Sequence, residues 1–244
     1  MVESTTIAEV KCPTFDLHNG TKIPAVGLGT FLHPDCKEHV KSAILKYGYR
    51  HIDTAMKYEN EAAIGEALQE CMAAGVKRED LFITTKLWHT DKNDVEAGIK
   101  RSLEKLKLDY VDLYLIHWMR PAIDWENGEK ILTPPNHVVW AGMESLVEKG
   151  LTKSIGVSNC TIPVLYDILA GCKIKPVVNQ VECHPYFQQT RVNEFHQKYG
   201  IFLESYAAVG SGHFTRRKEE YKDVSVLDDA VIKEIATAKG KSPA

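Results

Sequence analysis

The 244-residue sequence contains no long hydrophobic run and no excess of positive charge. Nothing in it approaches the roughly 20 apolar residues of a membrane span, and Met1 to Val10 lack the apolar stretch of a signal peptide. The formal net charge is -3, which gives no basic footprint for a phosphate backbone. We therefore expect no membrane or nucleic-acid partner, and we predict a cytoplasmic location.

The sequence also lacks any regular cysteine frame. Its six cysteines lie far apart and form no Cys-x-x-Cys pair. Scattered cysteines in a chain of this size are typical of reduced thiols, whereas zinc sites and disulfide scaffolds need close or regular spacing. We predict no metal site and no disulfide. The cysteines are Cys12, Cys36, Cys71, Cys160, Cys172 and Cys183.

The sequence contains only part of the phosphate-binding motif Gly-x-Gly-x-x-Gly. The turn Gly27-Leu28-Gly29-Thr30-Phe31-Leu32 has the first two glycines and lacks the third. This weakens the case for a doubly wound dinucleotide-binding sheet. The composition, 44% apolar and 26% charged, is that of one globular domain, taken here as residues 1–244.

Strands and amphipathic helices alternate along most of the chain. Asn19-Gly20 first predicts a β-hairpin within residues 14–24, which we expect to plug one end of the fold. Helical stripes then separate seven apolar strands, which implies parallel β-α units in a barrel or an open sheet. The strands begin near Val26, Ile52, Phe82, Val111, Ser154, Val177 and Phe202, and the last helix is expected from about Asp228 to Lys239.

Polar residues at the carboxyl ends of the strands decide between the two architectures. An open sheet concentrates its functional groups near one switch point, whereas a barrel collects every strand end in one ring. Nearly every predicted strand ends in such a residue, so we predict an α/β fold of the (β/α)8 TIM-barrel type with its site at that ring. These residues are Gly29, Thr30, Asp53, Lys86, His117, Ser158, Asn159, Gln180 and Tyr206.

Four of these strand-end and loop residues suggest proton transfer at oxygen. Asp53 ends a hydrophobic strand, and a buried carboxylate needs a cationic partner, for which Lys86 is the obvious candidate. A lysine beside Tyr58 favours the phenolate, so we expect a lowered tyrosine pKa. His117 ends another strand at the same level. Together they predict a site that adds or removes a proton.

Six motifs in this order resemble those of the aldo-keto reductase family, in particular its aldose and aldehyde reductases, over nearly the whole chain. No single motif is specific, but six on the expected elements are. They are Gly27-Leu28-Gly29-Thr30, Arg50-His51-Ile52-Asp53-Thr54-Ala55 with Tyr58, Thr84-Thr85-Lys86-Leu87-Trp88, Asp109 to Trp118, Ser154-Ile155-Gly156-Val157-Ser158-Asn159, and Asn179 to Tyr186.

The resemblance implies an NAD(P)H-dependent oxidoreductase that reduces an aldehyde, aldose or ketone to an alcohol. Tyr58 would be the general acid, Lys86 paired with Asp53 would tune it, and His117 would orient the carbonyl. No metal is needed. The alternative is a non-catalytic or impaired protein of the same fold that serves in binding or regulation, which has no need of these four residues.

The resemblance also implies where the cofactor and the substrate lie. NADPH is expected, with NADH possible; the carboxamide would meet Ser158, Asn159 and Gln180, and the ring would stack on Tyr206. The remaining cofactor-binding residues would be Gly29, Thr30, Asp53, Ala207, Val209, Gly210 and Ser211, and the substrate pocket would contain Phe31, Trp88 and Trp118.

Two departures from the family pattern bear on these expectations. Met119 stands where a proline is usual after Trp118, so the loop from Trp118 to His137 is expected to take its own path. Only seven strands are accounted for, and the family's eighth strand and last helix are expected to be missing from this chain, which makes the domain C-terminally incomplete. With the full barrel present, a monomer is expected.

Overall fold

Seven parallel strands form one curved sheet in simple chain order. The computed structural model describes residues 12–33, 35–119, 133–210 and 225–244. Each strand pairs in parallel with the next along the chain, and no eighth strand joins the two edges within these residues. The sheet is a nearly closed barrel, as predicted. Its strands are β3 (Gly27–Gly29), β4 (His51–Asp53), β5 (Phe82–Leu87), β6 (Val111–Ile116), β7 (Thr152–Ser158), β8 (Val178–Glu182) and β9 (Phe202–Tyr206).

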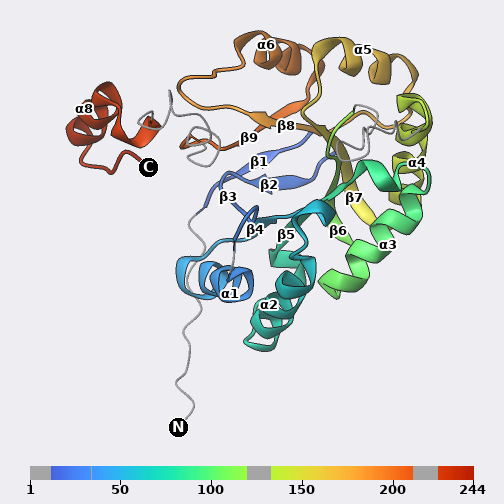
Figure 1. Cartoon of the computed structure of the whole chain (residues 1–244), viewed down its shortest axis with the longest axis horizontal. Helices are drawn as coiled ribbons and strands as arrows, with labels where there is room; N and C mark the ends of the chain where they lie inside the picture. Colours follow the sequence, from blue (N-terminus) through green and yellow to red (C-terminus); the bar gives the residue numbers. More distant parts are fainter. Residues whose placement is uncertain (1–11, 34, 120–132, 211–224) are drawn as a thin grey trace, which may run out of the picture.

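Helices follow the strands and lie around the outside of the sheet (Figure 1). Their ends carry the expected signals: Gly48 and Gly200 end two helices with positive φ, and the Asp94 side chain accepts from Ala97 N at 2.9 Å. The helices are α1 (Cys36–Tyr47), α2 (Glu61–Ala73), α3 (Val95–Leu106), α4 (Asn136–Glu148), α5 (Ile162–Gly171), α6 (Thr190–Tyr199) and α8 (Ala230–Ala238), with single 3₁₀ turns η1 (Met56–Tyr58), η2 (Arg78–Asp80), η3 (His89–Asp91) and η5 (Val226–Asp228).

The predicted hairpin is present and covers the amino end of the barrel. Strands β1 (Thr14–Asp16) and β2 (Lys22–Pro24) pair antiparallel, and Gly20 takes the positive φ of 83° that the turn requires. The hairpin places Leu17 and Ile23 in a cluster with inward-facing strand residues. That end of the barrel interior is therefore filled with apolar side chains.

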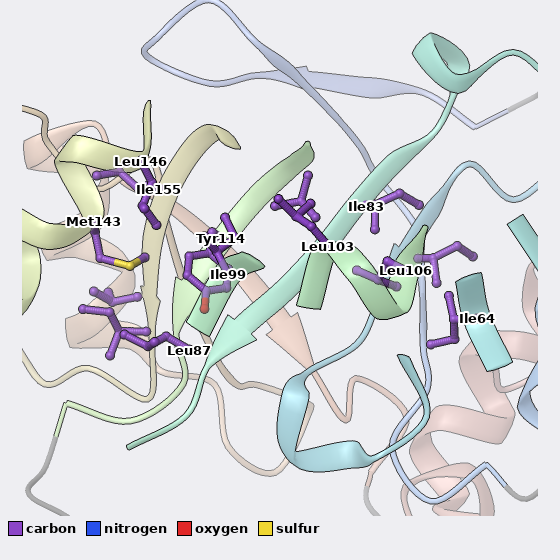
Figure 2. Packing of buried hydrophobic residues seen from close by; sticks show 14 of the residues in the cluster. Ile64, Ile83, Leu87, Ile99, Leu103, Leu106, Tyr114, Met143, Leu146 and Ile155 are labelled. Carbon is purple, nitrogen blue, oxygen red and sulfur yellow. The ribbon is translucent and has the colours of Figure 1, made fainter. Parts of the chain in front are cut away.

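The two faces of the strands carry different residues because side chains alternate along a strand. On β5, Ile83 and Leu87 point outward into the main core, where they meet Ile99 and Leu103 of α3 and Tyr114 of β6 (Figure 2). This packing against helices holds the barrel wall in place.

The side chains on the inner face of the barrel are apolar at the hairpin end and polar at the opposite end. Phe82, Leu113 and Val178 lie near the hairpin, whereas residues further along the same strands are polar and still buried. Polar groups without water need partners inside the barrel, so the carboxyl end must contain a hydrogen-bonded network. Its buried members are Asp53, Thr84, Lys86, His117, Ser158 and Gln180.

Helix α8 begins later than the sequence predicted. The expected start near Asp228 was wrong because residues 226–228 form the turn η5, and Asp229 then caps the helix by accepting from Val231 N at 2.9 Å and Ile232 N at 3.1 Å. Figure 1 shows α8 apart from the helices around the sheet. Its cap is tied to the β8–α6 loop by a 2.7 Å hydrogen bond from Tyr186 Oη to Asp229.

All six cysteines are free thiols in the structure. Within the described residues, none of the helices combines the length and the apolar composition needed to cross a bilayer.

Candidate active site

Lys86 lies at the centre of the polar end of the barrel. Its side chain is 0% exposed, and its ammonium donates to Asp53 Oδ1 at 2.5 Å and to Thr54 O at 2.9 Å. The predicted ion pair between Asp53 and Lys86 is therefore confirmed. Burial opposes the charge on Lys86, but Asp53, Tyr58 and Glu204 together outweigh it, and the pKa of the ammonium is raised. A cation is thus held in the barrel interior at any physiological pH.

The second oxygen of Asp53 is also fixed. Gln180 on β8 donates from Nε2 to Asp53 Oδ2 at 2.8 Å. β4 and β8 are not neighbours in the sheet, so this bond crosses the barrel interior. Because both carboxylate oxygens are engaged, Asp53 holds Lys86 in one position.

Tyr58 reaches this pair from the turn η1 after β4. Lys86 Nζ lies 3.4 Å from Tyr58 Oη, and the ammonium also lies 5.0 Å from the centre of the phenol ring. Burial raises the pKa of Tyr58, Lys86 lowers it, and the net pKa is raised. The expectation of a lowered tyrosine pKa was wrong for the protein without cofactor. The free-energy cost of removing the phenolate from water is larger than the stabilisation that the Lys86 ammonium provides.

His117 faces the same space from the end of β6. Its ring meets Tyr58 edge to face at 5.6 Å between centroids, and Trp88 at 5.0 Å. Burial and then the charge of Lys86 lower the pKa of His117 to about 3. The imidazole is therefore neutral at neutral pH and carries a single N–H that it can donate.

These groups surround an open cavity of about 470 Å³, here called the central cavity. All three residues predicted for the substrate pocket contribute to its wall: Phe31, Trp88 and Trp118. Phe31 packs on the Tyr58 ring at 5.0 Å. The full lining is Gly29, Thr30, Phe31, Asp53, Lys57, Tyr58, Trp88, His117, Trp118, Ser158, Asn159, Gln180, Tyr206 and Ala207.

One side of the central cavity suits a flat ring that bears an amide. Tyr206 exposes its ring there, and its hydroxyl donates to Asn159 Oδ1 at 2.8 Å. Asn159 has a positive φ of 54° and donates from Nδ2 to His117 O and Ser158 Oγ, both at 3.1 Å. An aromatic platform beside amide and hydroxyl groups fits a nicotinamide, since the ring can stack and the carboxamide can bond.

The segment predicted to pass beside a pyrophosphate only partly reaches this space. Ala207 lines the central cavity. Val209 lines a neighbouring cavity of about 680 Å³ along β9, which shares Tyr206 and Ala207 with the central cavity. Gly210 instead lies against Val226, where an added Cβ would come within 2.7 Å of a Val226 methyl carbon. Ser211 lies outside the described residues, as does most of the loop after Trp118.

Two charged residues near the site were not predicted. Lys57 lines the central cavity directly before Tyr58. Glu204 on β9 points into the barrel, with an oxygen within 4.8 Å of ligand atoms of His51 and Asp53. Strand alternation could have revealed Glu204, because it shares a face with Phe202 and Tyr206. Lys57 carries no sequence signal, since its role depends on the cavity.

The chain is similar in sequence to known proteins. Residues 18–244 match the model of the "Aldo/keto reductase family". "Aldo-keto reductase family 1 member A1" of Gallus gallus is 42% identical, covering 96% of this chain and 75% of the relative. "NADP-dependent D-sorbitol-6-phosphate dehydrogenase" of Malus domestica is 41% identical, covering 95% and 78%. "Glycerol 2-dehydrogenase (NADP(+))" of Hypocrea jecorina is 40% identical, covering 94% and 77%.

Proposed function

Because the chain belongs to the aldo/keto reductase family, an oxidoreductase family of carbonyl chemistry, we propose that it reduces aldehyde, aldose or ketone carbonyls to alcohols with NADPH, NADH being the alternative donor. The observation that carries the proposal is the contact of Tyr58 with the buried Lys86–Asp53 pair at the wall of an aromatic-lined cavity.

The proton is delivered by Tyr58. Its raised pKa keeps the phenol protonated through neutral pH, so the acid is present in its working form. When the proton leaves, the phenolate stays beside the ammonium of Lys86, which stabilises it by charge. Asp53 and Gln180 keep that ammonium in place.

His117 positions the carbonyl group. As a neutral imidazole it donates one hydrogen bond to the carbonyl oxygen, on which negative charge develops during reduction. Its ring lies edge to face with Tyr58 on the wall of the same cavity, so one carbonyl oxygen would accept from both donors. The aromatic rings of Phe31, Trp88 and Trp118 would exclude water from the organic part of the substrate.

The cofactor would lie against the part of the cavity wall that contains Ser158, Asn159, Gln180 and Tyr206. A nicotinamide bound there would supply the hydride. Ser158, Asn159 and Gln180 would hold its carboxamide, and Tyr206 would stack on its ring. NADPH is preferred in the proposal because two of the relatives are named for NADP dependence.

Removal of one hydroxyl tests the proposal. Tyr58→Phe is expected to lower kcat for reduction of an aromatic aldehyde by about 10²- to 10⁴-fold, the usual contribution of a general acid. The rate is followed by nicotinamide absorbance. Tyr47→Phe removes the same atom from an exposed tyrosine on α1 and should leave the rate unchanged. Equal rates for Tyr58→Phe and the unmodified protein would exclude Tyr58 as the acid and favour a non-catalytic role for the site.

A further inference from the structure

The charged side chains that line the central cavity are not all closely paired with a counterion. Its ionisable lining residues are Asp53, Lys57, Tyr58, His117 and Tyr206. The charge of Asp53 is matched by Lys86 at 2.5 Å, and His117 is neutral at neutral pH. The phenols of Tyr58 and Tyr206 have raised pKa values and are neutral as well. Among the described lining residues, the ammonium of Lys57 is therefore the charge whose counterion is distant, since Glu59 Oε1 lies 3.9 Å away.

Lys57 is placed to meet a substrate. It precedes Tyr58 in the turn η1, so its backbone is fixed one residue from the acid. Its side chain is 53% exposed, and it lines both the central cavity and an adjoining cavity of about 530 Å³. The ammonium thus lies at the rim, between the reacting end of the site and the outside.

Within the part of the chain that the structure describes, Glu59 is the one carboxylate at ion-pair distance from Lys57, and it competes weakly. Glu59 Oε1 lies 3.9 Å from Lys57 Nζ, at the limit of an ion pair, and the Glu59 side chain is 80% exposed. An exposed pair of this length contributes little, because water screens both charges. The adjoining cavity is also lined by Leu32, His33, Glu59 and Asn60, and it shares Phe31 and Tyr58 with the central cavity. Among the described residues that line the two cavities, Lys57 is the one lysine or arginine, so an anion entering this space would pair with it.

We propose that Lys57 makes this site select carbonyl substrates that carry a negatively charged group, a carboxylate or a phosphate, a short chain away from the carbonyl. The proposal rests on the proposed function and names the substrate class of that same site. A substrate whose carbonyl meets Tyr58 and His117 would share the central cavity with Lys57, so an anionic group on a short tail would be able to pair with the ammonium. A neutral tail gains nothing there, and a cationic tail is repelled.

Matched substrates test the selection. The pairs are succinic semialdehyde against butanal for a carboxylate, and glyceraldehyde 3-phosphate against glyceraldehyde for a phosphate. The readout is the ratio of kcat/KM for the anionic member to that for the neutral member. We expect the ratio to fall about tenfold in Lys57→Met and further in Lys57→Glu, as for loss of one charge-assisted contact. Raised salt should lower the ratio in the unmodified protein.

Lys46→Met is the control, since Lys46 is an exposed lysine on α1 that lines none of these cavities. Its ratio should equal that of the unmodified protein. A ratio that is the same in Lys57→Met and in the unmodified protein for both pairs would overturn the proposal. A fall for one pair alone would identify which anion the site takes.

Binding separates this proposal from the proposed function. Trp88 and Trp118 line the central cavity, so tryptophan fluorescence reports occupancy without turnover. Tighter binding of succinic semialdehyde than of butanal, lost in Lys57→Met, would support the charge selection even if neither were reduced; absence of reduction would then count against the reductase. Equal binding of both aldehydes, with the same affinities in Lys57→Met, would overturn the selection whatever the activity.

Discussion

At the scale of single residues, burial is the largest influence on the pKa values of Lys86, Tyr58 and His117, and in each case it disfavours the charged form. Lys86 and Asp53 are both buried and form an ion pair, and Asp53 helps to raise the pKa of Lys86. Tyr58 and His117 are kept neutral by the same burial. A proton donor and a hydrogen-bond donor therefore stand beside a fixed cation, which is the arrangement that a developing oxyanion requires.

Glu204 is a second carboxyl group near this ion pair. Its side chain is 15% exposed, it lies 3.8 Å from His51 Nε2, and burial followed by repulsion from Asp53 raises its pKa to about 8. His51 offers no charge in return, because burial lowers its pKa to about 4. Ionised Glu204 would add a second carboxylate beside Asp53, with Lys86 as the nearby cation.

The pH dependence of stability should reveal Glu204. Between its ordinary pKa of 4.5 and about 8, the folded protein holds a proton that the unfolded chain releases, so stability falls as the pH rises through this window. Glu204→Gln removes the ionisation and keeps a similar shape. We expect it to raise the free energy of unfolding by about 2 kcal/mol at pH 9 and by much less at pH 5. Urea unfolding at both pH values measures this.

A surface change provides the comparison for Glu204. Glu148→Gln alters an exposed glutamate at the end of α4, and its effect should not grow with pH. If Glu204→Gln stabilised equally at both pH values, Glu204 would be ionised throughout and the account of its burial would be wrong.

At the scale of elements, the barrel wall depends on close contact between neighbouring helices. Gly65 of α2 faces the carboxyl end of α3, where an added Cβ would lie 2.3 Å from Lys105 O and 2.8 Å from the Leu106 carbonyl carbon. These are backbone atoms, which cannot move aside as a side chain can. The α2 and α3 helices therefore approach as closely as a glycine allows.

Gly65→Ala should separate these helices. Alanine improves helix propensity by about 1 kcal/mol, but overpacking against backbone outweighs that gain, so we expect a net loss of about 2 kcal/mol or more in the free energy of unfolding. Chemical denaturation measures it. Gly171→Ala, at the open end of α5 with no atom within 4 Å of the added carbon, should cost nothing. Equal stabilities of the two variants would show that α2 and α3 are not in tight contact.

At the scale of the whole molecule, simple rules predicted most of the fold and of the site. Asn19-Gly20 placed the hairpin, and the alternation of strands and helices gave seven parallel strands in order. The carboxyl ends of parallel strands share one rim of a barrel, so Asp53, Lys86 and His117 had to converge. Local sequence patterns were sufficient for these features because each one depends on residues that are close together in the sequence.

Features that depend on distances across the barrel could not be predicted in this way. Burial raises the pKa of Tyr58 and the charge of Lys86 lowers it. The sequence does not show which of the two effects is larger. The tight approach at Gly65 and the place of Lys57 on the cavity rim arise from pairs of elements. Helix α8 starts late because Asp229, rather than the aspartate before it, caps the helix.

The central claim is that a hydride from a nicotinamide and a proton from Tyr58 meet at a carbonyl in the central cavity. The most direct measurement is to supply NADPH with deuterium in place of the transferable hydrogen, together with an aromatic aldehyde, and to analyse the alcohol by mass spectrometry. We predict an alcohol that carries one deuterium on the former carbonyl carbon, and almost none formed by Tyr58→Phe. An alcohol without deuterium, or no alcohol from the unmodified protein, would contradict the account.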